Sequence, residues 1–261
     1  MRALSLPGCA CRGAFQFAAL ARLAARGERF DVVAGASSGS ISGAVFVAGL
    51  AAQGPEFVRG LMSTPLVSTK YLATEGSPFG MRKIVRDMLA RYVPEELLDG
   101  TDAELLVATT HARRYAKGLL DRRRPDWERD GLVVHSNRAR KAMHEVILAS
   151  CYIPLLYAGL VRLDGEVHVD GGAADNTLVD VLVARGATDV TVVTPYPDGG
   201  VSRTVFSPEL PPVVPPHVRL RLIYPARRLS MGRFDFAPAA FEEALSIEQV
   251  ERVIEPKERV A

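Results

Sequence analysis

A serine flanked by glycines near the start of the chain is the first candidate for chemistry. The stretch Gly35-Ala36-Ser37-Ser38-Gly39 fits the pattern G-x-S-x-G and lies between an apolar run typical of a buried strand and a small-residue run typical of a helix. A serine on such a sharp strand-to-helix turn holds its hydroxyl clear of the backbone, and glycines permit close packing around it. We therefore predict Ser37 as a nucleophile supported by Gly35 and Gly39. Ser38, which would begin the helix, is the nearest alternative.

Short apolar runs that alternate with longer amphipathic runs must position this serine. Such alternation predicts strands and helices wound into a mainly parallel sheet, here as one domain over residues 1–261. Strands are expected at residues 3–6, 30–34, 105–110, 166–170, 190–194 and 220–223, with further β candidates at 115–120 and 132–135. Helices are expected at residues 14–25, 38–52, 81–92, 138–150, 176–184 and 239–252. The proline-rich segment 201–217 is expected to be a surface loop.

The early position of the G-x-S-x-G turn separates this sequence from the usual α/β-hydrolases. Ser37 follows only the second predicted strand, whereas the nucleophile of those enzymes follows several. Three further stretches occur in the order found in the patatin-like phospholipases, which the sequence resembles: Gly8-Cys9-Ala10-Cys11-Arg12-Gly13, Leu148-Ala149-Ser150-Cys151-Tyr152-Ile153-Pro154 and Asp170-Gly171-Gly172. The resemblance covers nearly the whole chain and is weakest between residues 55 and 140. It implies a patatin-like, three-layer α/β/α fold with a mainly parallel central sheet.

The resemblance also implies a Ser-Asp dyad, in which Asp170 takes the proton from Ser37 during attack on an ester carbonyl. This role requires the carboxylate to lie within hydrogen-bond reach of the hydroxyl in a partly desolvated site. Asp170 ends a predicted strand, and Gly171 and Gly172 allow the backbone to turn sharply there. An Asp-Gly turn that merely joins two elements is the ordinary alternative.

The loop after the first predicted strand supplies the oxyanion hole in this interpretation. The backbone N–H groups of Gly8, Cys9 and Ala10 are expected to converge on the oxygen of a tetrahedral intermediate, where one donor contributes about 3 kcal/mol. Cys9 and Ala10 stand where the family has glycines, so the loop works only if these positions need no positive φ. Arg12 matches the family's arginine and is expected to brace the loop or attract a phosphate head group, with a solvated cation as the alternative. Gly13 supports the start of the helix.

Histidines and cysteines suggest two further kinds of site. A Ser-Asp-His triad would need His217, which follows Asp170 in chain order but lies in the proline-rich segment. His168 lies two residues before Asp170, on the same face of a strand, and is a candidate modifier of its pKa. The three cysteines have no histidine or fourth cysteine at ligand spacing, so we expect neither a metal nor a cofactor.

Composition and charge exclude several classes of protein. A net charge of +2, from 32 basic and 30 acidic residues, provides no field that would attract nucleic acid. Three cysteines are too few for a disulfide framework and indicate a reducing, cytoplasmic setting. The apolar stretch before Cys9 is too short for a secretion signal. The uncharged stretch 32–55 concentrates hydroxyls and glycines, which favours a buried strand and helix over a membrane span.

The resemblance implies a serine acyl hydrolase that cleaves acyl esters of phospholipids or other lipids through an acyl-enzyme intermediate. Two alternatives stay open: a catalytically impaired lipid-binding relative, and an acyltransferase that passes the acyl group to an acceptor other than water. The expected partner is a lipid or fatty ester, with peripheral membrane contact. The basic residues Arg113, Arg114, Lys117 and Arg122-Arg123-Arg124 are candidates for contact with anionic head groups, with a solvated loop as the ordinary alternative.

Overall fold

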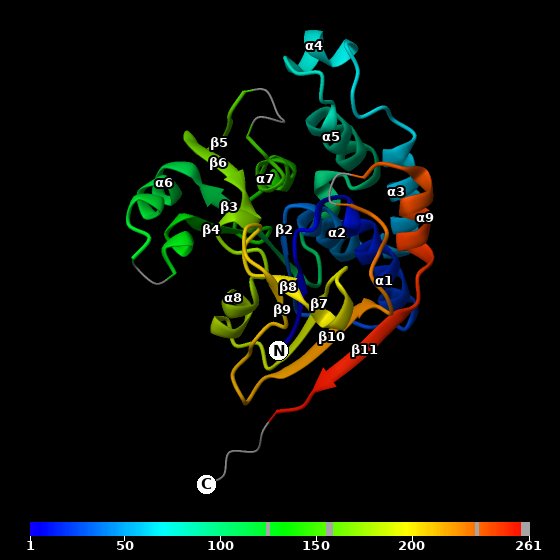
Figure 1. The fold of residues 1–261 in the computed structure, drawn as a ribbon, viewed down its shortest axis with the longest axis vertical. Coiled ribbons are helices and arrows are strands. Elements are labelled where there is room, and N and C mark those ends of the chain that lie inside the picture. Colours follow the sequence, from blue (N-terminus) through cyan, green and yellow to red (C-terminus); the bar gives the residue numbers. More distant parts are fainter. Residues whose placement is uncertain (124–125, 155–158, 233–234, 257–261) are drawn as a thin grey trace.

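A nine-stranded sheet runs through the computed structural model, which describes residues 1–123, 126–154, 159–232 and 235–256. The strand order is β11-β10-β7-β1-β2-β3-β6-β5, and β4 also pairs with β3 (Figure 1). Its strands are β1 (Arg2–Leu6), β2 (Val32–Ala36), β3 (Glu104–His111), β4 (Leu132–Ser136), β5 (Val161–Leu163), β6 (Glu166–Asp170), β7 (Asp189–Val193), β10 (Arg219–Pro225) and β11 (Gln249–Ile254). The five strands from β10 to β3 are parallel, and the strands outside them are antiparallel. We call the edge where the parallel strands end the carboxyl edge and the opposite one the amino edge.

Helices and loops cover both faces of the sheet because the central strands are apolar on both faces. The helices in the larger core are α1 (Ala14–Ala25), α2 (Ser38–Val47), α3 (Gly54–Met62), α5 (Met81–Tyr92), α7 (Met143–Ser150) and α9 (Pro238–Ser246). A smaller core on the other face includes α8 (Val179–Ala184). Alternate residues of one strand point into the two cores, Leu4 and Leu6 into the larger and Ala3 into the smaller. The predicted three-layer α/β/α fold with a mainly parallel central sheet is confirmed.

Short elements connect these layers. They comprise α4 (Lys70–Glu75), α6 (Ala112–Leu120), the 3-10 turns η1 (Ala10–Gly13), η2 (Ala51–Gln53), η3 (Glu95–Leu97), η4 (Trp127–Gly131), η5 (Gly171–Ala173) and η6 (Pro197–Gly199), and the strand pair β8 (Val201–Ser202) and β9 (Glu209–Leu210). The last pair lies in the segment expected to be only a loop. Among the described residues, none of the helices is both long and apolar enough to cross a bilayer.

Two sequence predictions were wrong about the type of element. Residues 115–120 were β candidates but belong to α6, where Gly118 packs closely against the backbone of Trp127 and the His111 side chain accepts a hydrogen bond from the N–H of Arg114. The closing helix was expected to reach residue 252 but ends at Ser246. Residues 249–254 instead pair with β10, because the exposed edge of that strand offers a full ladder of backbone hydrogen bonds.

The boundaries of several elements also differ from the predicted ones. The helix expected from residue 138 begins at Met143, and the one expected from residue 176 begins at Val179. In both cases the residue before the helix, Ala142 or Leu178, has a positive φ, which breaks the helical path. Helix α2 ends at Val47, short of the expected residue 52, and β2 extends two residues beyond its expected end. That extension brings the strand directly to Ser37.

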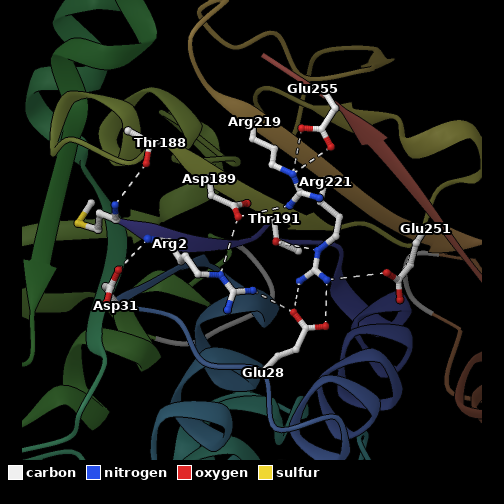
Figure 2. Close-up of polar contacts among 11 residues, drawn as sticks. Arg2, Glu28, Asp31, Thr188, Asp189, Thr191, Arg219, Arg221, Glu251 and Glu255 are labelled. Atoms are coloured by element: carbon white, nitrogen blue, oxygen red, sulfur yellow. Dashed lines mark hydrogen bonds and ion pairs between the residues drawn. The ribbon is translucent and has the colours of Figure 1, made fainter.

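A network of paired charges ties the strands together at the amino edge (Figure 2). The guanidinium of Arg221 donates to both carboxylate oxygens of Glu28, at 2.9 and 2.5 Å, and to the hydroxyl of Thr191 at 3.1 Å. Arg2 also donates to Glu28, at 3.1 Å, and lies 3.8 Å from Asp189. The network therefore links β1, β7 and β10 to the turn after α1.

Candidate active site

A strained turn between β2 and α2 carries the predicted nucleophile. Ser37 has φ 50° and ψ −128°, a conformation that costs a non-glycine residue about 1 to 3 kcal/mol. Its N–H donates to the Ser150 hydroxyl at 2.8 Å, and its carbonyl accepts from the Ser40 hydroxyl at 2.6 Å. A side chain at Gly39 would overlap the carbonyl oxygen of Leu6. Glycine is required there because α2 starts directly against the end of β1.

The predicted base, Asp170, is brought to this turn because β2 and β6 pair with successive parts of the same side of β3. Ala36, the last residue of β2, pairs with Ala108 of β3, and the next residue of β3, Thr109, pairs with Asp170 of β6. Because β4 occupies the other edge of β3 here, β6 continues along the edge that β2 leaves. Ser37 therefore faces the end of β6, close enough to Asp170 for its hydroxyl to lower the pKa of that carboxyl.

Burial decides the protonation chemistry of Asp170. The residue is 9% exposed, and burial raises the pKa of its carboxyl to about 6. The nearby Ser37 hydroxyl and the Gly172 N–H, which donates to Asp170 Oδ1 at 2.8 Å, oppose this rise by stabilising the ionised form. A carboxylate with this pKa is mostly ionised at neutral pH and more basic than an exposed one, as a general base for a hydroxyl requires.

The glycine-bearing loop between β1 and α1 lies beside Ser37. The Gly8 N–H donates to Asn176 Oδ1 at 2.9 Å, and Asn176 Nδ2 donates back to the Gly8 carbonyl at 3.0 Å. The Cys9 N–H donates to the Ser38 hydroxyl at 3.0 Å. Ala10 has φ 53°, so one of the two replaced glycines does occupy a position with positive φ. Two of the three predicted oxyanion donors are thus hydrogen-bonded to side chains in this structure.

Arg12 braces this loop. Its Nε donates to the Met231 carbonyl at 2.9 Å, and its Nη1 donates to the Tyr196 hydroxyl at 3.3 Å, with the guanidinium over the Tyr196 ring. Gln16, fully buried, donates to the carbonyls of Pro7 and Val193 at 2.8 and 3.2 Å. These contacts tie the loop to the ends of β7 and β1 and leave Arg12 well anchored within the fold.

The remaining predicted glycines all face atoms of the site. A side chain at Gly35 would overlap the backbone of Gly39, and one at Gly171 would overlap the carbonyl of Ala108. Added Cβ atoms would lie 2.7 Å from Ser37 Cβ at Gly8, 3.2 Å from Ser38 at Gly13, and 2.6 Å from Asn176 at Gly172. Close backbone approach therefore explains why this site is rich in glycine.

An apolar cavity of about 510 Å³ opens at the nucleophile. Ser37, Ser38 and Ala10 line one end, and the walls come from α1, α2, α3, α5, α9 and the segment around Val67 and Phe79. Two buried thiols contribute to the wall: burial raises the pKa of Cys11 to about 12 and raises that of Cys151 well above its usual range. These cysteines therefore stay protonated and add apolar surface.

The two histidines considered for the site, His217 and His168, lie in other environments. His217 is exposed, two residues before β10, and so lies at the amino edge, opposite Ser37. His168 Nδ1 contacts the Thr109 hydroxyl at 2.9 Å, and the hydrogen bonds that act on the pKa of Asp170 come from Ser37 and Gly172. His217 is therefore not placed to complete a Ser-Asp-His triad with Ser37. In the part of the chain that the structure describes, no cluster of three or more histidine, cysteine, aspartate or glutamate residues is arranged to hold a metal ion.

Comparison with known proteins identifies the family of this chain. The sequence matches the patatin-like phospholipase family over residues 4–183. The chain belongs to this family. Patatin-like phospholipases are lipid acyl hydrolases, so the strained serine and the apolar cavity lie in a fold associated with that chemistry. No curated protein is similar enough in sequence to match. The crystal structure of VipD from Legionella pneumophila is similar, with 16% identity, coverage of 77% of this chain and 50% of VipD, and a TM-score of 0.44. The chain thus spans half the length of VipD.

Two residues that hold this patatin-like site together are not among the predicted site residues. Ser150 fixes the backbone of Ser37, and Asn176 clamps the Gly8 peptide from both sides. Both are nearly or fully buried. The available signal was the family resemblance, since Ser150 lies in the stretch before Pro154 and Asn176 follows Asp170-Gly171-Gly172 closely. The hydroxyl of Ser38, the alternative nucleophile, accepts a hydrogen bond from the Cys9 N–H.

Proposed function

We propose that this chain is a serine acyl hydrolase that cleaves acyl esters of phospholipids or other lipids through a Ser37-Asp170 dyad. One observation carries the proposal: the strained Ser37 contacts a buried carboxylate with a raised pKa and opens on an apolar cavity of about 510 Å³. That combination suits attack on an ester whose acyl chain is buried beside the nucleophile.

The proposed reaction uses Asp170 twice. The Ser37 Oγ attacks the carbonyl carbon while Asp170 takes its proton, and the carbonyl oxygen becomes an oxyanion. Collapse of this intermediate breaks the ester C–O bond, and Asp170 returns the proton to the leaving alcohol. A water molecule then attacks the acyl-Ser37 carbonyl while Asp170 takes its proton. Collapse of this second intermediate breaks the bond from the acyl carbon to Ser37 Oγ and releases the fatty acid, and Asp170 returns the proton to Ser37.

The loop from Gly8 to Ala10 supports stabilisation of the oxyanion in this proposal. Ala10 lines the cavity together with Ser37, and the loop is held against the nucleophile by Asn176 and Ser38. The N–H groups of Gly8 and Cys9 already donate to these side chains. The oxyanion would therefore share or replace those acceptors as it forms, as happens when catalytic hydrogen bonds tighten only with substrate bound.

A lipid panel assayed with wild type and Ser37→Ala tests the proposal. We expect wild type to release fatty acid with a burst of the leaving alcohol, and Ser37→Ala to lose at least about 10³-fold in rate, because the acyl-enzyme cannot form. A fluorophosphonate probe should label wild type at Ser37 and leave Ser37→Ala unlabelled. Absence of labelling and turnover in folded wild type would identify a lipid-binding relative. Transfer of the acyl group to added alcohols or lysolipids in place of water would identify an acyltransferase.

A further inference from the structure

Helix α6 and the turn that follows it carry a cluster of exposed positive charge. The cluster consists of Arg113, Arg114, Lys117, Arg122 and Arg123. Within the described ranges, none of these five side chains forms an ion pair, and Arg122 lies over the ring of Trp127 at 5.8 Å. Arg124, the last member of the predicted basic run, lies outside the described residues. The cluster contrasts with the amino edge, where arginines are paired with carboxylates.

Acidic neighbours do not cancel this charge. Asp126, in the same turn, is already paired with Arg203. Asp121, Glu128 and Asp130 are the other acidic residues close in sequence, three against the five cations of the cluster. The surface therefore keeps a positive excess even though the whole chain carries a net charge of only +2.

Exposed apolar side chains lie beside the cations. Leu120 is 89% exposed and Leu119 is 39% exposed, and both border a shallow hollow together with Asp121, Arg122 and Arg123. Tyr115 and Trp127 pack together beneath this surface, with ring centroids 5.2 Å apart. Cations interleaved with exposed leucines and underlying aromatic rings form the composition that binds at a membrane–water interface.

The position of α6 suits a lipid held at the candidate active site. The helix begins at the carboxyl end of β3 and contacts β6, which ends in Asp170. Helices α3, α5 and α9, which contribute walls of the apolar cavity, lie on the other side of β2 from α6, and α6 lies beyond β3 and β6 (Figure 1). An ester bound at Ser37 would therefore have the apolar cavity on one side and the cationic surface on the other.

We propose that α6 and residues 121–123 form a docking surface for anionic lipid membranes. The proposal rests on the proposed function for its substrate geometry, but the binding itself needs no catalysis. Charge complementarity with anionic head groups supplies the attraction, and Leu119 and Leu120 enter the interface. Exposed leucines amid the cations favour a membrane over nucleic acid, whose binding needs no apolar insertion.

Vesicle binding by Ser37→Ala tests the surface without hydrolysis of the lipid. Co-sedimentation is measured with vesicles of phosphatidylcholine alone or mixed with phosphatidylglycerol. Trp127, the only tryptophan of the chain, lies under the proposed surface and reports docking by a blue shift of its fluorescence. We expect binding and a blue shift with the anionic vesicles only, weakened by added salt.

Charge reversal locates the binding. Lys117→Glu and Arg123→Glu, added together to Ser37→Ala, should weaken partitioning onto anionic vesicles at least about tenfold. Each cation near an anionic membrane adds to the binding free energy, and each reversal replaces it with a repelled charge. The matched control adds Arg22→Glu with Arg252→Glu, two exposed cations on other elements, and should change partitioning by less than about twofold. Thermal melts establish that both variants fold. In the wild-type background, both should keep normal hydrolysis of a water-soluble short-chain ester.

Three results would overturn the docking surface. One is equal loss of binding in the two charge-reversed proteins, which would leave only net charge as the cause. Another is binding to a short DNA duplex without binding to anionic vesicles. The third is binding to anionic vesicles with unchanged Trp127 fluorescence. Failure of the proposed function appears separately, as wild type that docks on vesicles but releases no fatty acid.

Discussion

The two edges of one sheet treat charged residues in opposite ways. At the amino edge, Glu28 accepts hydrogen bonds from Arg221 and Arg2, and these hold the pKa of its carboxyl below the usual value (Figure 2). At the carboxyl edge, Asp170 is buried beside neutral groups, the Ser37 hydroxyl and the Gly172 N–H that donates to it, and burial raises its pKa. The two environments lie at opposite ends of the same parallel strands, although Asp170 itself ends the antiparallel strand β6.

This difference shows where the fold is stabilised and where it is kept reactive. Paired charges at the amino edge lower the energy of the ionised carboxylate and tie strands together. At the carboxyl edge a buried carboxylate, a strained serine and a positive φ at Ala10 each raise the energy of the folded state. Such costs are typical of functional sites, where reactivity depends on groups held away from their most stable condition.

Replacing Asp170 or Glu28 by its amide should give the largest difference between the two edges, because one variant should lose activity and the other stability. Asp170→Asn should lower ester hydrolysis by about 10³-fold because the general base is lost, and it should not lower the melting temperature because the amide carries no buried charge. Glu28→Gln should keep full hydrolysis but lose about 2 kcal/mol of unfolding free energy, since Arg221 loses its nearest counter-charge in a half-buried site and keeps only Glu251, at 3.8 Å. Comparable activity losses in both variants would contradict the comparison.

Filling the cavity should affect only long-chain substrates. Leu61 lines the cavity, and Leu61→Trp should exclude several methylenes of an acyl chain. Loss of burial for three methylenes costs about 2.4 kcal/mol, or about 60-fold in kcat/KM for long-chain esters, while acetate esters keep their rate. Val253→Trp places the same side chain on exposed β11 near the amino edge and should leave both rates unchanged. An equal loss for short and long chains would place the effect outside the cavity.

The pH dependence should follow the raised pKa of Asp170. Because Asp170 accepts a proton only when ionised, kcat/KM should fall about tenfold per pH unit below pH about 6 and level off above it. Stability should change in opposite senses at the two edges. The contribution of Asp170 is present at low pH and lost as pH rises through about 6, because its folded-state pKa is raised. The contribution of Glu28 is present at neutral pH and lost as pH falls through its lowered folded-state pKa.

Thermal melts across pH test the stability part of this prediction. Asp170→Asn should lack the loss of stability near pH 6, and Glu28→Gln should lack the loss at low pH. An acid limb of kcat/KM centred near pH 4 would show that Asp170 behaves as an exposed carboxyl.

Relief of backbone strain should produce the smallest effect. Ala10→Gly and Ala142→Gly both place glycine at a positive φ, and each should raise the unfolding free energy by about 1 kcal/mol. Ala142 precedes α7, away from the nucleophile, so its variant should leave hydrolysis unchanged. Ala10→Gly should keep at least the wild-type rate, since the family carries glycine at this position. Destabilisation by Ala10→Gly would show that the loop is unstrained.

Local patterns in the sequence were sufficient for much of the fold and for the nucleophile. The turn at Ser37 could be predicted because its glycines, the preceding strand and the following helix are neighbours in sequence. Short segments with ambiguous periodicity were assigned to the wrong type of element, because their own residues do not decide between helix and strand. Residues 115–120 form a helix that packs against Trp127, and residues 249–254 form a strand that pairs with β10. In both cases contacts outside the segment decided its conformation.

The tertiary structure alone decided how the site is assembled. The residues around Asp170 do not predict that β6 pairs with β3 directly after the point where β2 ends. This pairing nevertheless places the Asp170 carboxylate beside Ser37. Ser150 and Asn176 acquire their roles in the same way, through hydrogen bonds to residues far away in sequence. The raised pKa of Asp170 also depends on burial by the whole fold. The sequence by itself determined which residues were available for chemistry, whereas their contacts and acidity came from packing, because both depend on neighbours that the chain order does not specify.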